Sequence, residues 1–334
     1  MRKSYITIAG SKFSFEEILL IALHYNANGD KYSSMVYFFG GNWGLYTYPI
    51  NFFSSLIFKK YYHRISGRSL RYWAETGEID SFRESVWRNA CFDEDGNQDV
   101  PIPLAAFRVM MWCDTMPHSM CAPGQGPVNR DDERYAFAFL LQRAFYTKYG
   151  KIWGCKTQAC LLPNGMIANA WCCGICHNDK GAINFSGLEV EMKTAFQNHR
   201  LGEGNEYPAM FTDNIYMPSE VLVCRRHQEG EYWERMTSMG EDVEHLFGSV
   251  SSLWKRLSKK YIWKLKKMGF GAMKHILTLF FLTNCYTCLH GSKTSRKYNF
   301  PNHSLDDYLD VGHDDAFDGD DEDHPYQNIL THIL

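Results

Sequence analysis

Three carboxylates follow or flank apolar segments of the chain, which would hold them beside a buried core. Asp114 comes directly after the apolar run at residues 107–113, and Asp213 comes directly after the short run at 209–212. Both runs have the composition of buried strands, so each Asp should lie at a strand end. Glu244 flanks a stripe of apolar residues at helical spacing, so it should border the buried face of a helix.

Acids at adjacent strand ends, joined by one from a facing helix, suit the binding of hard divalent cations. Mg²⁺ and Mn²⁺ prefer oxygen ligands, and two such ions about 3.5–4 Å apart can stabilise the attacking and leaving oxygens of a phosphoryl transfer. The alternative for each acid alone is an ordinary solvated side chain, since the chain has 38 acids.

The middle of the chain predicts a mixed sheet. The runs at 107–113, 151–162 and 166–173 have strand character, and Pro163-Asn164-Gly165 supplies the Asn-Gly chemistry of a hairpin turn. These strands should be antiparallel, with the run at 209–212 as a fourth. Helical segments alternate with them, so the expected fold class is α/β with helices packed on a mixed sheet.

Helices are predicted after the first three strands. Ser186 and Glu189 have capping-box spacing, which predicts a helix that begins there. Apolar residues recur at helical spacing from Val243 to Leu257, the clearest helical pattern in the chain. The run at 276–289 is shorter than the roughly 20 residues that cross a bilayer and contains polar residues, which indicates a buried helix.

Residues 1–95 are predicted to be all-helical. A glycine-rich break at 39–44 separates two helices, an arrangement compatible with a helix-turn-helix, and the second helix ends in basic residues. The alternative is a plain helical cap with a solvated face. A polar segment at 93–103 is the expected domain boundary.

Charge is distributed unevenly along the chain. Residues 305–334 hold ten acids and no Lys or Arg, so the remaining chain carries 35 basic and 28 acidic residues. A basic body with an acidic tail indicates a polyanionic partner. Residues 291–334 are predicted to be a disordered tail, and 305–334 to be dispensable for folding.

Eight basic residues and no acid lie between Leu253 and His275, on a predicted amphipathic helix. A solvated face or a membrane-surface helix would show the same pattern. The nearby Glu244 favours DNA, because a strand that passes a metal site needs cations near its phosphates. The expected DNA contacts are Lys255, Arg256, Lys259, Lys260 and Lys264.

Eleven cysteines allow two interpretations. Cys172, Cys173, Cys176 and His177, with Cys155 and Cys160 on the neighbouring strand, could ligate zinc, but their spacing is irregular. Reduced cysteines that pack in the core are the simpler interpretation. Cys285 and Cys288 have the spacing of a redox pair, but packing is again favoured because their context is an apolar helical run.

Short motifs in a fixed order carry a family resemblance. They comprise Trp112-Cys113-Asp114-Thr115, Gln142-Arg143-Ala144-Phe145-Tyr146, Lys156-Thr157-Gln158, Pro163-Asn164-Gly165, residues 174–177 with Asp179, Phe211-Thr212-Asp213-Asn214-Ile215-Tyr216 and Val243-Glu244-His245-Leu246-Phe247-Gly248. As a set, the chain resembles the PIF/Harbinger transposases, which are DDE superfamily endonucleases. The resemblance covers most of residues 35–310.

The resemblance implies an RNase H-like catalytic domain over 100–290. Its three acids fall on Asp114, Asp213 and Glu244, with Asp114 bridging two Mg²⁺ or Mn²⁺ ions and the other two each holding one. His177 and Asp179 are possible supporting residues near the site. The acids Asp131 and Asp132 lie in a loop and are expected to take no part.

The implied activity is cleavage of phosphodiester bonds at transposon ends, followed by joining of the 3′-hydroxyl to target DNA. The resemblance also implies a separate Myb-like protein that helps DNA recognition and nuclear entry, and hence a location in the nucleus. An intracellular site is expected because the N-terminus lacks the layout of a secretory signal. The sequence leaves the oligomeric state open. The alternative hypothesis is a domesticated, catalytically silent protein that binds DNA or acts as a scaffold.

Overall fold

The computed structural model describes residues 5–8, 10–92, 108–121, 145–147, 152–201, 205–225, 229–258, 263–264 and 270–310. Its strands are β1 Tyr5–Ile8, β2 Ser11–Ser14, β3 Val109–Cys121, β4 Tyr146–Thr147, β5 Ile152–Leu161, β6 Ile167–Gly174, β7 Ala209–Thr212, β8 Leu222–Val223 and β9 Trp263–Lys264. Its α-helices are α1 Phe15–Asn28, α2 Tyr32–Phe39, α3 Thr47–Tyr61, α4 Gly67–Glu75, α5 Ile79–Cys91, α7 Asp179–Ser186, α8 Leu188–Ala195, α9 Glu231–Leu253, α11 Phe270–His290, α12 Lys293–Lys297 and α13 Leu305–Leu309. Short 3₁₀ segments are η1 Trp43–Tyr46, η2 Tyr62–Arg64 and η4 Lys255–Leu257.

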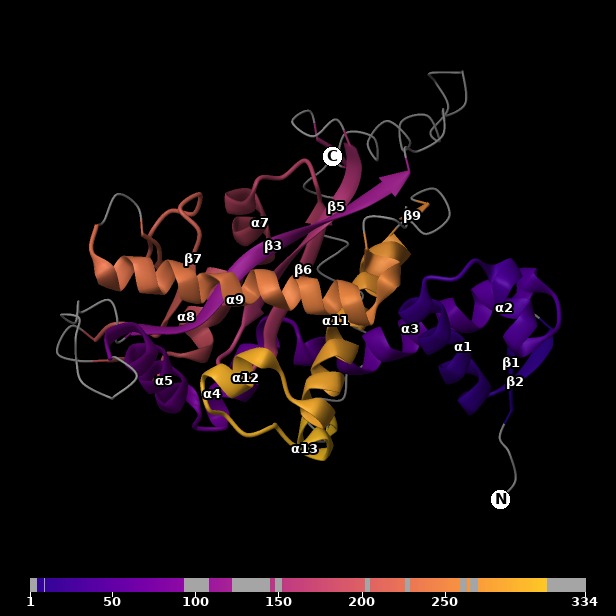
Figure 1. The fold of residues 1–334 in the computed structure, drawn as a ribbon, viewed down its shortest axis with the longest axis horizontal. Helices are drawn as coiled ribbons and strands as arrows, with labels where there is room; N and C mark the ends of the chain where they lie inside the picture. The colour runs from indigo at the N-terminus through magenta and orange to yellow at the C-terminus, as the bar shows by residue number, and fades with distance from the viewer. Residues whose placement is uncertain are drawn as a thin grey trace.

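A mixed sheet lies within the larger part of the molecule, with helices packed on it, while the β1–β2 hairpin, α1 and α2 lie at one end of the molecule (Figure 1). The strand order is β4-β5-β3-β7-β8, while β6 also pairs with β5 and β9 with β3. The predicted antiparallel order of the first three strands is confirmed, since β5 pairs antiparallel with both β3 and β6. The predicted fourth strand is β7, which lies parallel to β3.

The turn between β5 and β6 forms at the predicted Asn-Gly pair. Gly165 has φ +81°, a conformation that glycine adopts without a Cβ penalty. Its N–H donates to the Leu162 carbonyl, and the Asn164 side chain accepts from the Met166 N–H. A Cβ at Gly165 would lie 1.9 Å from the Ser292 hydroxyl, so α12 packs directly on this turn.

α11 is the buried helix that the apolar run predicts. Ile276, Leu277, Leu279 and Phe280 are fully buried in the core beneath the sheet. Asn284 is also buried, and its side-chain amide accepts from the Ile167 N–H and donates to the Ile167 carbonyl, which ties α11 to β6. None of the described helices is long and apolar enough to span a membrane.

The N-terminal prediction needs correction. Residues 1–95 are not all-helical, because β1 and β2 form an antiparallel hairpin before α1. Ser14 then begins α1 with a reciprocal capping box to Glu17, which accounts for the abrupt change from strand to helix. α4 and α5 share one hydrophobic core with the sheet, through residues such as Trp73 and Phe82.

The predicted basic helix over Leu253 to His275 is also wrong. α9 ends at Leu253, η4 follows, β9 pairs with β3, and α11 begins only at Phe270. Trp254 leaves the helical conformation at φ −118° and ψ +79°, and its indole N–H donates to Thr283 on α11. This tertiary contact overrides the local helical pattern.

The predicted helix start at Ser186 lies in the wrong place. Ser186 is the last residue of α7, Gly187 adopts a left-handed conformation with φ +67°, and α8 begins at Leu188. The Ser186 hydroxyl accepts from the Leu188 N–H instead of forming a capping box with Glu189. A glycine at this place ends one helix and starts the next.

Residues 291–310, expected to belong to the disordered tail, form α12 and α13 against the core. Tyr298 is 4% exposed and Tyr308 is fully buried. Tyr308 accepts a hydrogen bond from the Asn284 amide at 2.8 Å. The tail prediction is therefore too long at its start, because buried aromatic side chains hold this segment. The later part of the tail, 311–334, lies outside the described residues.

Two buried histidines should make the fold sensitive to acid. His118 on β3 and His275 on α11 are 2% and 1% exposed, and burial lowers the pKa of each to about 3. Because the unfolded chain binds protons near pH 6.5 and the folded chain does not, stability present above that pH is lost as the pH falls. Each of the two histidines should lower the free energy of unfolding by about 1.4 kcal/mol for every pH unit below about 6.5.

Chemical denaturation at pH 7.5 and pH 5.5 checks the prediction. The two buried histidines together contribute a pH dependence to the free energy of unfolding, and His275→Gln should remove about half of that contribution. The matched control is His245→Gln, since the His245 side chain is 69% exposed. Equal pH dependence in His275→Gln and in the native protein would contradict the prediction.

Candidate active site

Asp114, Asp213 and Glu244 line one cavity of about 250 Å³. The pairing of β3 with β7 ends at Cys113 and Thr212, so the next residue of each strand is one of the two aspartates. α9 packs across β3, β5 and β7 and brings Glu244 to the same cavity. The structure thus brings together the three acids that were predicted from the sequence.

The position of Asp114 differs from the prediction in one respect. β3 does not end there but continues to Cys121, paired throughout with β5. It is the β7 side of the strand that becomes free after Cys113. Asp114 is half-buried at this edge, whereas Asp213 and Glu244 are exposed.

Local hydrogen bonds orient the two aspartates. The Asp114 carboxylate accepts from the Thr115 N–H at 2.7 Å, and the Asp213 carboxylate accepts from the Asn214 N–H at 2.6 Å. Gly240 lies on α9 beside this cavity, where an added Cβ would be 3.6 Å from the Phe211 ring. Gly240 therefore contributes no side chain at this point of the cavity lining.

The site concentrates negative charge around Asp114. Burial, together with the charges of Asp179, Glu244 and Asp213, raises the pKa of Asp114 to about 6, although the hydrogen bond from the Thr115 N–H lowers it. Arg225 is the basic residue among the described residues that line the cavity. A divalent cation would offset this accumulated charge.

The carboxylate oxygens of these acids are suitable ligands for a divalent cation, but they are not already arranged around a metal position. Among the residues that the structure describes, no group of three or more His, Cys, Asp and Glu side chains is arranged to hold a metal ion. Carboxylates without a cation between them repel one another, which favours separated side chains. Asp114, Asp213 and Glu244 are the cavity residues whose carboxylates could hold a divalent cation.

Asp179 lies on the other side of the sheet and has its own partners. Its carboxylate accepts from Thr115 at 2.8 Å and from the Lys156 ammonium at 2.7 Å. Thr115 alternates with Asp114 along β3, so its side chain points to the opposite face of the sheet. Asp179 therefore influences Asp114 through its charge, which raises the pKa of Asp114. Sequence patterns did not identify Lys156 as its partner, although Lys156 belongs to one of the motifs.

His177 precedes α7 and packs its ring against Phe185 at a centroid distance of 4.6 Å. Burial and the nearby Lys156 charge lower the pKa of His177. His177 does not line the cavity of Asp114.

The expected DNA contacts that the structure describes lie on two short elements, η4 and β9. Arg256 stacks over the Tyr25 ring at 4.8 Å, so it connects η4 to α1, while Lys255 is exposed. Lys264 lies on β9. Lys259, Lys260 and the loop acids Asp131 and Asp132 lie outside the described residues.

The cysteine cluster packs in the core. Cys155, Cys160, Cys172 and Cys173 are buried, and Cys176 is exposed. Burial raises the pKa of the Cys155 and Cys173 thiols well above the ordinary value, which disfavours the thiolate that ligates zinc. Burial also raises the pKa of Cys285 and Cys288 to about 12, so these thiols are poor redox nucleophiles.

Comparison of the chain with protein-family models, with curated proteins and with solved structures gave no match.

Proposed function

We propose that this protein is a metal-dependent DNA endonuclease of the PIF/Harbinger transposase type, with an RNase H-like catalytic domain around β3, β5, β6, β7 and α9. The observation that carries the proposal is the meeting of Asp114, Asp213 and Glu244 in one cavity. These acids come from two adjacent strands and a helix that crosses them. Their order along the chain, and the motifs around them, resemble the pattern of this family.

The residues of the cavity have separate roles in the proposed reaction. Asp114, Asp213 and Glu244 would hold two Mg²⁺ or Mn²⁺ ions, which activate the attacking oxygen and offset charge on the phosphate. Arg225 lines the same cavity and would contact a phosphate oxygen there. Thr115 and Asn214 hold the aspartates in place through their N–H groups. Asp179 remains paired with Lys156 as a positioning residue.

The implied substrate is double-stranded DNA at transposon ends and at the target. The α2–η1–α3 segment, with exposed Lys59 and Lys60 at its end, is the proposed DNA-recognition element. A Myb-like partner and a nuclear location complete the proposal. The domesticated alternative predicts DNA binding without cleavage, so one assay separates the two hypotheses.

The assay measures nicking of a supercoiled plasmid that carries the repeats flanking the gene. Cleavage is expected with Mn²⁺ or Mg²⁺ and not with EDTA, in the presence of the candidate partner protein. A fully bound but intact plasmid under every metal condition would contradict the proposed nuclease and support the silent alternative.

Glu244→Gln tests the third carboxylate. The substitution keeps the size of the side chain but removes the charge, so nicking should fall by at least about 100-fold while the melting temperature stays unchanged. Glu241→Gln is the matched control, because Glu241 lies one turn earlier on α9 and lines the same cavity. Loss of activity in Glu241→Gln with full activity in Glu244→Gln would reassign the third ligand.

A further inference from the structure

A second and larger cavity adjoins the candidate active site. It has a volume of about 590 Å³ and lies between α9 on one side and the end of α11 with α12 on the other. Glu244 lines both cavities, so one surface leads from the second cavity to the first. This second cavity, the α9–α12 groove, is lined by residues that include His245, Ser249, Tyr286, His290, Lys293 and Arg296.

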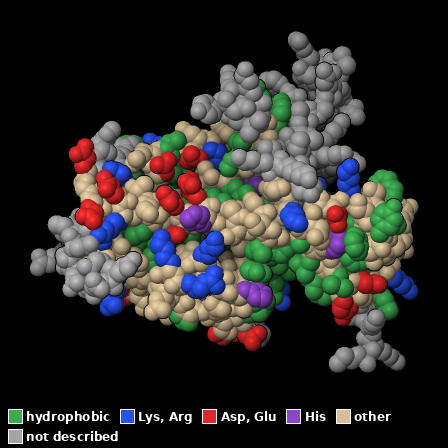
Figure 2. Space-filling model, in the orientation of Figure 1, with side chains coloured by type: hydrophobic (Ala, Val, Ile, Leu, Met, Phe, Trp, Pro, Cys, Tyr) green, Lys and Arg blue, Asp and Glu red, His purple; other side chains and the backbone are tan. Residues whose placement is uncertain are grey.

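The α9–α12 groove is basic. Lys293 and Arg296 are exposed on α12, and neither forms an ion pair with a described residue. Among the described lining residues, Glu244 is the one acid, and it stands at the end shared with the active site. On the face shown in Figure 2, acidic side chains gather above α9 and Lys, Arg and His side chains lie below it. A polyanion would therefore be attracted to the groove.

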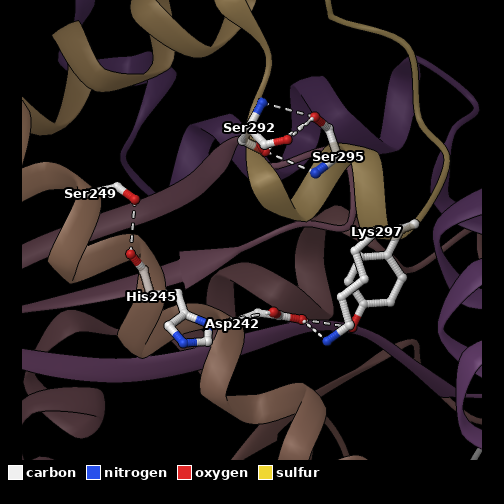
Figure 3. A network of polar contacts seen from close by, with 7 residues as sticks. Asp242, His245, Ser249, Ser292, Ser295 and Lys297 are labelled. Atoms are coloured by element: carbon white, nitrogen blue, oxygen red, sulfur yellow. Dashed lines mark hydrogen bonds and ion pairs between the residues drawn. The ribbon is translucent and has the colours of Figure 1, made fainter.

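Buried charge beneath the groove is already compensated. Asp242 is 7% exposed, and its carboxylate accepts from Lys297 and from the Tyr298 hydroxyl, both at 2.8 Å. Figure 3 shows this network beside His245 and Ser249 of α9 and Ser292 and Ser295 of the α12 region. The network joins α9 to α12 and so fixes the two walls relative to each other. Lys293 and Arg296 remain for a ligand.

The groove also carries an exposed aromatic surface. Tyr286 is 42% exposed, and its ring lies 4.4 Å from the His290 ring, one turn later on α11. On the α9 side of the groove, the lining includes the small residues Gly248, Ser249 and Ser252. Both serine hydroxyls donate to carbonyls of their own helix. Nucleic-acid bases stack on such rings when they are not paired in a duplex.

We infer that the α9–α12 groove binds an unpaired stretch of the DNA strand that runs into the active site. Tyr286 and His290 would stack on its bases, and Lys293 and Arg296 would contact its phosphates. Sites that bind single-stranded nucleic acid usually combine basic side chains with exposed aromatic rings. The inference rests on the proposed function for the identity of the strand as DNA and for its direction toward Glu244.

Binding of fluorescent oligonucleotides, measured by anisotropy without divalent metal, tests the groove apart from cleavage. The probes are a single-stranded dT oligomer, its RNA counterpart and a hairpin duplex. Tyr286→Ala should weaken binding of the dT oligomer about tenfold, and Tyr286→Phe should restore it, because stacking needs the ring and not the hydroxyl. Duplex affinity should change less than twofold.

The double variant Lys293→Ala/Arg296→Ala tests the phosphate contacts. It should lower the slope of log affinity against log salt by about 1.4 for the single strand, or 0.7 for each phosphate contact. Arg88→Ala/Lys193→Ala is the matched control, because both residues are cations that line neither cavity. Unchanged single-strand affinity and salt slope in the groove variants, or equal losses in the control, would overturn the inference.

Plasmid nicking by the same variants separates the two proposals. If single-strand binding depends on Tyr286 but the protein cuts no DNA, the inference on the groove is supported and the proposed nuclease activity is contradicted. If the protein cuts DNA and the groove variants bind oligonucleotides normally, the nuclease activity is supported and the inference on the groove is contradicted. Melting curves verify that the variants fold, as expected for side chains that lie on the surface.

Discussion

Asp114→Asn is expected to abolish metal-dependent cleavage and, at the same time, to stabilise the metal-free protein. Nicking should fall by at least about 1,000-fold, since removal of one ligand disables a site whose residues act as a unit. The carbonyl oxygen of Asn can still accept from the Thr115 N–H, so local geometry is kept.

The stability gain follows from the charges around Asp114. Asp114 is ionised at neutral pH, but its raised pKa of about 6 means that this ionised form is less stable in the folded protein than in the unfolded chain. Replacement by a neutral amide removes this cost, which is about 1–2 kcal/mol after allowance for the partial exposure of the group. A gain of this size raises the melting temperature by roughly 1–3 °C for a chain of 334 residues.

Differential scanning fluorimetry with and without Mn²⁺ measures both effects. Mn²⁺ should raise the melting temperature of the native protein more than that of Asp114→Asn, because a ligand that binds only the folded state stabilises it. Glu229→Gln is the control, as Glu229 is an exposed acid outside the cavity. A destabilised Asp114→Asn variant, or one that retains full nicking activity, would argue against a metal-binding carboxylate cluster.

Truncation after Pro301 is expected to destabilise the protein severely, in contrast to the expectation from its acidic composition. The deletion removes Tyr308, whose ring packs against Phe281 at 5.8 Å and whose hydroxyl meets the Asn284 amide. It also removes the Asp310 carbonyl, which accepts from the buried Arg64 guanidinium. Loss of a buried aromatic side chain alone costs about 3–5 kcal/mol.

Point variants and a second truncation locate the effect. Tyr308→Ala should lower the free energy of unfolding by about 3–5 kcal/mol, and Tyr308→Phe by about 1–2 kcal/mol, because Phe keeps the packing but leaves the amide without this partner. Truncation after Asp310 keeps these contacts and should leave the urea midpoint nearly unchanged. Equal stability after truncation at Pro301 and at Asp310 would show that residues 302–310 contribute nothing.

Local patterns in the sequence predicted the central strands and the acids beside them. The Asn164-Gly165 pair marks a turn because glycine adopts a positive φ at no steric cost, and this turn sets the β5–β6 hairpin. The run at 276–289 predicted α11 because an apolar helix without a polar face must be buried. Asp114, Asp213 and Glu244 were found because each directly follows or flanks such a pattern.

Long-range contacts decided the features that the sequence patterns missed. Trp254 ends α9 beside Thr283, and Arg256 stacks on Tyr25, so the basic segment does not form one exposed helix. The acidic residues near 306 suggested disorder, yet Tyr308 binds Asn284 in the core.

Periodicity in a sequence reports neighbours up to about four residues apart on a helix or two on a strand. It therefore determined the α/β character, the β5–β6 turn and the positions of the three acids relative to their own elements. The partners of Trp254, Arg256 and Tyr308 are distant in sequence, and burial against them provides the stabilisation. Only the tertiary structure decided that Glu244 borders two cavities, because α9, α11 and α12 form the α9–α12 groove by packing together.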